Sequence, residues 1–291
     1  MKKAFLMAAV AAGLVGCSGD EPKDEQVKND EKEAVVTFSV DVTDGGGDAG
    51  GAASRLTRGT PVASSDMTDL WIYDYVGGEQ KQGTHQRSSD SGFGTVSMSI
   101  PLGQHTFYFV ASMGDEPNEE TDGVITWAKT KDTFWGKAEL NLTNGTTANV
   151  DVELQRVVTK LAVNITDVVP SDIATLTITP QTWYYGLNYT TGEPTGAQDG
   201  VERTVSVPAS FVGTTDLAMS IMGFAGVSGF ETGFTVTARN ASNATIGQAT
   251  VAAAPFVQNR TTRFSGPLFH ANEGITITLA DEWLDEYTAT W

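Results

Sequence analysis

Short segments of alternating apolar and polar residues recur along this chain and constrain its fold more than any other feature. In the first of them, Val36, Phe38, Val40 and Val42 alternate with polar residues. A period of two puts the apolar side chains on one face of a β-strand. Gly and Pro separate such segments, and long helical periodicity is absent, so the chain is predicted to be all-β. Further strands are predicted at 70–76, 96–100, 105–111, 140–142, 150–154, 161–165, 176–178, 201–207, 217–222, 234–238, 244–251 and 275–279.

The strand pattern that ends at Leu154 continues through Arg156 into residues 161–165. We place a domain boundary in this shared ribbon. The prediction is a β-sandwich domain over residues 34–156 and a second over 157–291, each with about seven strands.

Two local features are predicted within the first domain. Asn144-Gly145 lies between two alternating segments, which is a strong signal for a β-hairpin. Between Gly114 and Gly136 an acidic loop is expected, with a short helix from Trp127 to Trp135. The acids lack the fixed spacing of a calcium loop, so no metal site is predicted.

The N-terminus has the pattern of a secretory signal. Lys2 and Lys3 precede an apolar run that is shorter than the roughly 20 residues needed to span a bilayer. Residues 1–16 are therefore predicted to be removed. Cys17, the single cysteine of the chain, follows Leu-Val-Gly as in a bacterial lipobox, so it is predicted to carry a lipid anchor.

Residues 17–33 are predicted to be a disordered acidic tether, because seven acids and three lysines follow Cys17 with almost no apolar residue. The whole chain has a formal net charge of −18 at pH 7. Such a charge repels phosphate backbones, so nucleic acid is excluded as a partner.

A glycine-rich segment follows the first strand. Five of the ten residues from Asp44 to Ala53 are glycine, and Arg55 and Arg58 come next. Such a segment is expected to be flexible and open to proteases. It is either a solvated surface loop or a processing site after one of the two arginines.

The end of the sequence is unusual because Tyr287, Ala289 and Trp291 alternate up to the last residue. Chain ends normally carry polar residues. This apolar stripe is expected to pair either within its own sheet or with a sheet of another molecule.

No catalytic or cofactor site is predicted. The three histidines, His85, His105 and His270, do not have the spacing of metal ligands, and no phosphate-binding glycine loop is present. The stretch from Pro180 to Tyr189 carries four aromatic residues and is interpreted as a loop. These rings either bind sugars or close the open end of a sandwich.

Several stretches taken together resemble the Bacteroidales fimbrillin superfamily, whose members build type V pili. They are the lipobox at Cys17 and the ranges 101–107, 154–163, 259–269 and 281–283. The resemblance implies two transthyretin-like, Greek-key β-sandwich domains in tandem. It also implies that a protease cutting after Arg removes the first strand and that a neighbouring subunit fills the groove.

For this chain the resemblance implies a removable strand at Val36 to Val42, cleavage at Arg55 or Arg58, and a strand donor formed by Tyr287, Ala289 and Trp291. The expected function is a structural fimbrial subunit at the cell surface, with other pilus subunits and a host or bacterial surface ligand as partners. The alternatives are an unprocessed pilus anchor and a surface glycan-binding lipoprotein.

Overall fold

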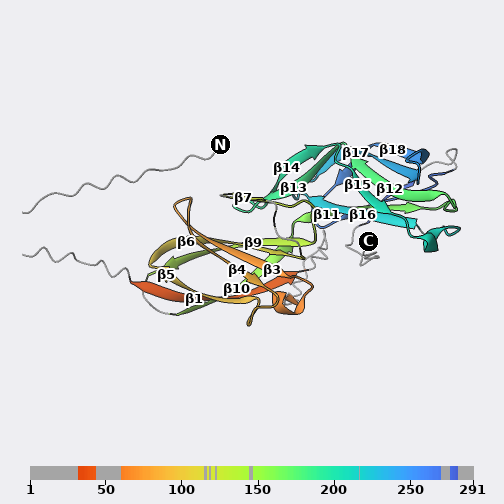
Figure 1. Ribbon diagram of the computed structural model, residues 1–291. Helices are drawn as coiled ribbons and strands as arrows, with labels where there is room; N and C mark the ends of the chain where they lie inside the picture. Colours follow the sequence, from red (N-terminus) through yellow and green to blue (C-terminus); the bar gives the residue numbers. More distant parts are fainter. Residues whose placement is uncertain are drawn as a thin grey trace, which may run out of the picture. The chain divides into compact units, whose positions relative to one another are not determined.

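The computed structural model describes residues 32–43, 60–114, 117, 119–121, 123–143, 147–215, 217–269 and 276–280. Within these ranges the elements are β-strands and two short 3-10 helices, η1 (Val62–Ser64) and η2 (Ala209–Phe211) (Figure 1). The all-β prediction is confirmed.

Eight strands of the first half form one sheet in the order β2-β1-β10-β9-β6-β3-β4, with β5 paired to β1. The bounds of the strands in this half, β7 and β8 included, are β1 (Glu33–Thr43), β2 (Thr60–Pro61), β3 (Asp69–Val76), β4 (Glu79–Arg87), β5 (Thr95–Pro101), β6 (Gly103–Ser112), β7 (Glu119–Thr121), β8 (Val124–Thr126), β9 (Thr133–Leu142) and β10 (Ala148–Arg156).

This sheet folds over on itself to enclose a core. Strand β9 pairs with β6 along its whole length, whereas β10 pairs with β1. The two strands pair antiparallel with each other, as predicted, but in the described residues only at Trp135–Gln155 and Phe134–Arg156, the end away from Asn144-Gly145. Both strands contribute to one core, Val152 and Leu154 from β10 and Phe134 and Leu142 from β9.

The second half contains three four-stranded sheets, in the orders β16-β11-β19-β20, β15-β12-β17-β18 and β14-β13-β8-β7. The bounds of its strands are β11 (Val158–Ile165), β12 (Ile173–Pro180), β13 (Thr182–Asn188), β14 (Glu193–Asp199), β15 (Arg203–Ser206), β16 (Leu217–Phe224), β17 (Phe230–Asn240), β18 (Thr245–Phe256), β19 (Thr261–Gly266) and β20 (Thr276–Ala280).

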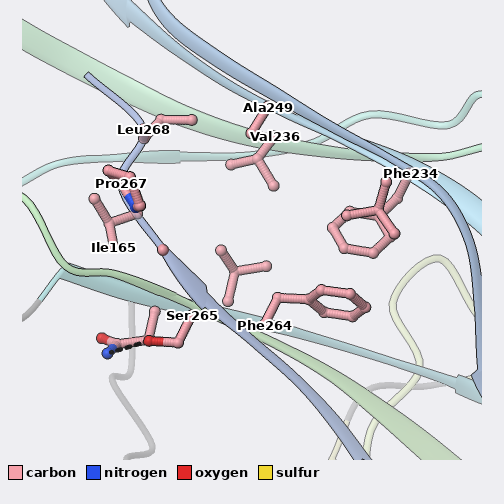
Figure 2. A pocket seen from close by; sticks show the side chains of 12 residues that line it. Ile165, Phe234, Val236, Ala249, Phe264, Ser265, Pro267 and Leu268 are labelled. Carbon is pink, nitrogen blue, oxygen red and sulfur yellow. Dashed lines mark hydrogen bonds between the residues drawn. The ribbon is translucent and has the colours of Figure 1, made fainter. Parts of the chain in front are cut away.

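A second core fills the space between β11 and β19 on one side and β17 and β18 on the other. A small apolar pocket opens into it, and the rings of Phe234 and Phe264 stand at one end of this pocket with 4.5 Å between their centroids (Figure 2). Pro267 and Leu268 line its other end.

The helix predicted from Trp127 to Trp135 is wrong. Residues 127–132 are irregular, and β9 begins at Thr133. The reason is that Trp127 and Phe134 bury their rings in two different apolar clusters, which one short helix would not allow.

The acidic segment before Trp127 is a hairpin, β7–β8, rather than a simple loop. It adds to β13, with Ile125 opposite Leu187. Residues that were assigned to the first domain thus extend a sheet of the second half. Residues from Lys32 on group into one compact unit, and the division at Arg156 into two tandem transthyretin-like domains stays a prediction.

Most of the aromatic stretch from Pro180 to Tyr189 is strand β13 (Thr182–Asn188), with Tyr189 in the turn that follows, rather than a loop. In it Trp183, Tyr185 and Tyr189 are each about 1 % exposed. Buried rings cannot stack on a sugar, so these three form no glycan platform, while Tyr184 is partly exposed. The loop interpretation is therefore wrong, and these three rings lie buried inside the fold.

Candidate functional site

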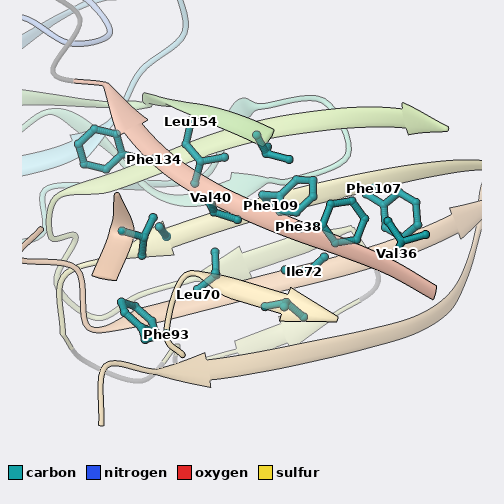
Figure 3. Packing of buried hydrophobic residues seen from close by; sticks show 14 of the residues in the cluster. Val36, Phe38, Val40, Leu70, Ile72, Phe93, Phe107, Phe109, Phe134 and Leu154 are labelled. Atoms are coloured by element: carbon teal, nitrogen blue, oxygen red, sulfur yellow. The ribbon is translucent and has the colours of Figure 1, made fainter. Parts of the chain in front are cut away.

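Strand β1 is the first strand described, and its inward side chains form the centre of the first core. Val36 and Phe38 are fully buried, and Val40 and Val42 are 2 % and 4 % exposed. Figure 3 shows Val36, Phe38 and Val40 pointing from β1 toward Leu70, Ile72, Phe107 and Phe109. The alternation seen in the sequence therefore corresponds to the buried face of the strand.

Phe38 has the largest of these inward side chains. Its ring lies 4.8 Å from that of Phe107 and 5.2 Å from that of Phe109, in tilted and edge-on arrangements. Both partners lie on β6, in the opposite layer of the sheet. Such contacts add to the burial of the ring itself.

Strand β1 also has backbone partners on both edges. It runs parallel to β10 from Val36–Ala148 to Thr43–Gln155. On its other edge it pairs antiparallel with β5 from Glu33–Pro101 to Ser39–Thr95, and then briefly with β2. We call the space between β5 and β10 that β1 fills the β1 slot.

An empty β1 slot would be costly. Burial of a Val or Phe side chain contributes roughly 1.5–3 kcal/mol, and the row contains three valines and Phe38. The facing edges of β5 and β10 would also lose their hydrogen-bond partners. Any process that removes β1 therefore requires another strand of alternating apolar residues to take its place.

The chain leaves β1 at Thr43 and returns at Thr60, where β2 pairs with Val42. Both ends of the 44–59 connection thus lie at the same end of β1. Arg55 and Arg58 belong to this connection and lie outside the described residues. A cut there would leave β1 attached to the rest of the fold by non-covalent contacts alone.

A buried polar cluster lies where β10 passes into β11. The Arg156 guanidinium binds both oxygens of Asp132, with Nε–Oδ1 and Nη2–Oδ2 distances of 2.7 and 2.9 Å. Its Nη1 donates to Asn259 Oδ1 at 3.0 Å, and the group lies 4.7 Å above the ring of Phe134. Arg156 is 5 % exposed, so this contact fixes three segments with one buried cation.

A tyrosine network also joins the two halves. The Tyr189 hydroxyl accepts from Gly123 N at 2.8 Å and donates to Gln80 Oε1 at 3.2 Å. It also lies 3.2 Å from the Tyr75 hydroxyl, while the Tyr189 ring stacks on Tyr73 at 4.1 Å. These contacts hold the β3–β4 region against the end of β13.

Tyr185 is a buried ring close to a cation. Burial raises the pKa of its hydroxyl above the ordinary value near 10, and the neighbouring Arg203 acts in the opposite direction. The Arg203 guanidinium lies 4.5 Å above the ring. The neutral phenol is therefore the favoured form well into the alkaline range.

Two histidines pair with aspartates of β3. His85 Nε2 lies 2.9 Å from Asp69 Oδ1, and its ring stacks on Trp71. His105 Nδ1 lies 2.8 Å from Asp74 Oδ1 in the interior. Sequence spacing did not indicate either pair, because each forms across neighbouring strands. His270 lies outside the described residues.

The remaining predicted site residues also lie outside the described residues: Cys17, Tyr287, Ala289 and Trp291. Within the described ranges, no three His, Cys, Asp or Glu side chains are grouped closely enough to hold a metal ion. No helix in those ranges is long and apolar enough to cross a membrane.

The profile of a family of unknown function, DUF6562, matches residues 118–291, which is more than half of the chain. The chain belongs to the DUF6562 family. The matched range begins directly before the β7–β8 hairpin. No curated protein sequence matches the chain.

Solved structures share the fold of this DUF6562 member at low sequence identity. A candidate adhesin from Bacteroides ovatus has a TM-score of 0.52 at 11 % identity, covering 84 % of this chain and 94 % of its own. A candidate cell adhesion protein from the same species has a TM-score of 0.50 at 12 % identity, covering 88 % of this chain and 99 % of its own. The fimbrial anchor protein Mfa2 from Porphyromonas gingivalis has a TM-score of 0.50 at 11 % identity, covering 84 % of this chain and 95 % of its own.

These neighbours show that the chain shares its fold with Bacteroidales proteins that carry fimbrial and adhesive descriptions. Their descriptions are those of an adhesin, a cell adhesion protein and a fimbrial anchor protein.

Proposed function

We propose that this DUF6562 member is a structural subunit of a cell-surface fimbria that assembles by exchange of its first strand. In this proposal β1 is released after a cut at Arg55 or Arg58, and a strand from another pilus subunit enters the β1 slot. The solved neighbours with fimbrial and adhesive descriptions support the coarser role at the cell surface.

The position of β1 is the observation that carries the proposal. This strand is the first one described, its inward side chains are almost completely buried, and it has ladder partners on both edges. Removing it would empty one continuous slot between β5 and β10. A donated strand would satisfy both the apolar row and the two open edges.

Attachment and donation involve residues outside the described ranges. We assign Cys17 as the lipid attachment point that brings the chain to the outer membrane. Tyr287, Ala289 and Trp291 remain the candidate donor strand for a neighbouring subunit, since in an extended segment they share one face.

The test is incorporation into filaments. A tagged chain is produced in its native bacterium, filaments are sheared from the cells, and the tag is sought in them by immunogold microscopy. The parent chain is expected in the filaments, and deletion of Tyr287 to Trp291 is expected to prevent incorporation or further growth. A parent chain that is found only away from filaments would refute the proposal.

A second candidate function is an anchor that keeps both its lipid and β1. The similarity to an anchor protein favours it, and so does the extensive pairing of β1. The two functions differ in one observable property, the first residue of the assembled chain.

A further inference from the structure

Strand β5 borders the β1 slot and is the bordering strand that would shift most easily if β1 left. Among the strands that the structure describes, β5 has a backbone ladder with β1 alone. If β1 leaves, β5 has no ladder to hold it. It would then be free to move across the gap and pair with β10, because unpaired N–H and C=O groups favour any available partner.

Two glutamines of β4 hold β5 without any contribution from β1. Gln86 Nε2 donates to Thr95 O at 3.2 Å, and Gly94 N donates to Gln86 Oε1 at 3.1 Å. Gln82 Nε2 lies 3.5 Å from Ser99 O. Gln82 and Gln86 are four residues apart, so they lie on one face of β4 and contact β5 at two points along its length.

A buried pair supplies the third contact. His105 Nε2 lies 3.0 Å from Pro101 O, at the end of β5. A carbonyl oxygen can only accept, so this ring nitrogen is the donor. His105 Nδ1 faces Asp74 Oδ1 at 2.8 Å, and Asp74 Oδ2 accepts from Gln82 Nε2 at 3.3 Å. His105 is 3 % exposed and Asp74 is fully buried.

We propose that Gln82, Gln86 and the His105–Asp74 pair form a brace that keeps β5 in place when β1 is absent. The brace holds the β1 slot open and correctly shaped for an incoming strand of alternating apolar residues. This inference rests on the proposed strand exchange and identifies the groups that keep the acceptor ready.

The physical advantage is preorganisation. A slot that had collapsed would have to reopen before a new strand could bind, and the cost of reopening would weaken binding. A braced slot avoids this cost. The brace residues are therefore positioning residues, because they act on the incoming strand through β5.

The experiment uses the full chain with a specific protease site inserted between Gly46 and Gly47. After cleavage, an excess of a fluorescent peptide with the sequence of residues 32–43 is added, and its binding is followed by anisotropy as it replaces β1. The variants are Gln82→Ala with Gln86→Ala, and Thr84→Ala as the matched control on the same face of β4. The melting temperature of each uncut protein is measured in parallel.

The brace predicts that the double variant binds the peptide about tenfold more weakly than the parent, the size expected for the loss of hydrogen bonds of ordinary strength. The uncut double variant should melt close to the Thr84→Ala control, since β1 still holds β5. Gln86→Glu retains the acceptor for Gly94 N but loses the donor to Thr95 O. Its affinity for the peptide should therefore lie between that of the parent and that of the double variant.

Three results would overturn the inference. Equal peptide affinity in the parent and the double variant would show that the glutamines do not preserve the slot. A loss of uncut stability as large as the loss of affinity would assign them a general structural role. A cleaved parent that never accepts the peptide would refute strand exchange itself, and with it the need for a brace.

Discussion

The surroundings of Arg156 depend on the tertiary fold. Its guanidinium binds Asp132 from the segment before β9 and Asn259 from the segment before β19. Asn259 has a φ of 56° and donates its own N–H to Val158 O. One buried side chain therefore ties together three segments that are far apart in the sequence.

Arg156→Ala is expected to lower the free energy of unfolding by about 3–5 kcal/mol, because it leaves the Asp132 carboxylate without its buried partner. Urea denaturation measures this loss. The control is Lys137→Ala, which breaks an exposed pair with Glu139 and should cost less than about 1 kcal/mol. A similar small loss for both variants would show that the Arg156 contacts contribute little.

Tyr185 gives a prediction at alkaline pH. Since burial raises its pKa in the folded protein, the unfolded chain loses this proton first, at a pH near 10. The contribution of Tyr185 to stability is present below that pH and is lost as the pH rises toward the folded pKa. Tyr185→Phe should therefore flatten the fall in stability above about pH 10. If the curves of stability against pH stay parallel for the parent and Tyr185→Phe in this range, the effect does not come from Tyr185.

At the scale of the strands, alternation predicted much of the fold. The segments at Val36–Val42 and Leu161–Ile165 are strands β1 and β11, because each buries one face. Strand β4 was missed, since it is an edge strand with a polar sequence. Strand β13 was missed because aromatic residues on both of its faces concealed the alternation.

The candidate site could be predicted in part. The buried row of β1 followed from its sequence, but its two ladder partners did not, because pairing between distant strands leaves no local pattern. The same holds for the brace: Gln82, Gln86 and His105 are ordinary polar residues until the sheet brings them to β5.

The strand topology predicts where a protease acts first. Arg156 and Lys160 are 5 % and 7 % exposed, so they are poor substrates in the folded state. Mild trypsin is expected to cut at Arg55 or Arg58 before it cuts at either of them. Mass spectrometry of the first stable fragment identifies the site, and a first cut at Arg156 or Lys160 would contradict the proposed processing.

For the whole molecule, the contacts between the two halves predict cooperative unfolding. The β7–β8 hairpin pairs with β13, and Trp127 packs 6.3 Å from Trp71 and 5.3 Å from Phe224 between ring centroids. Calorimetry of the full chain should therefore show one transition with equal calorimetric and van't Hoff enthalpies. Two separate transitions would favour the independent domains predicted from the sequence.

The central claim is that β1 is absent from the assembled subunit. Intact-mass spectrometry of the chain released from purified filaments tests this claim most directly. Processing after Arg55 or Arg58 predicts a chain that begins at Leu56 or Gly59 and lacks β1. A chain in the same filaments that begins at an acylated Cys17 and retains residues 33–43 would contradict the claim.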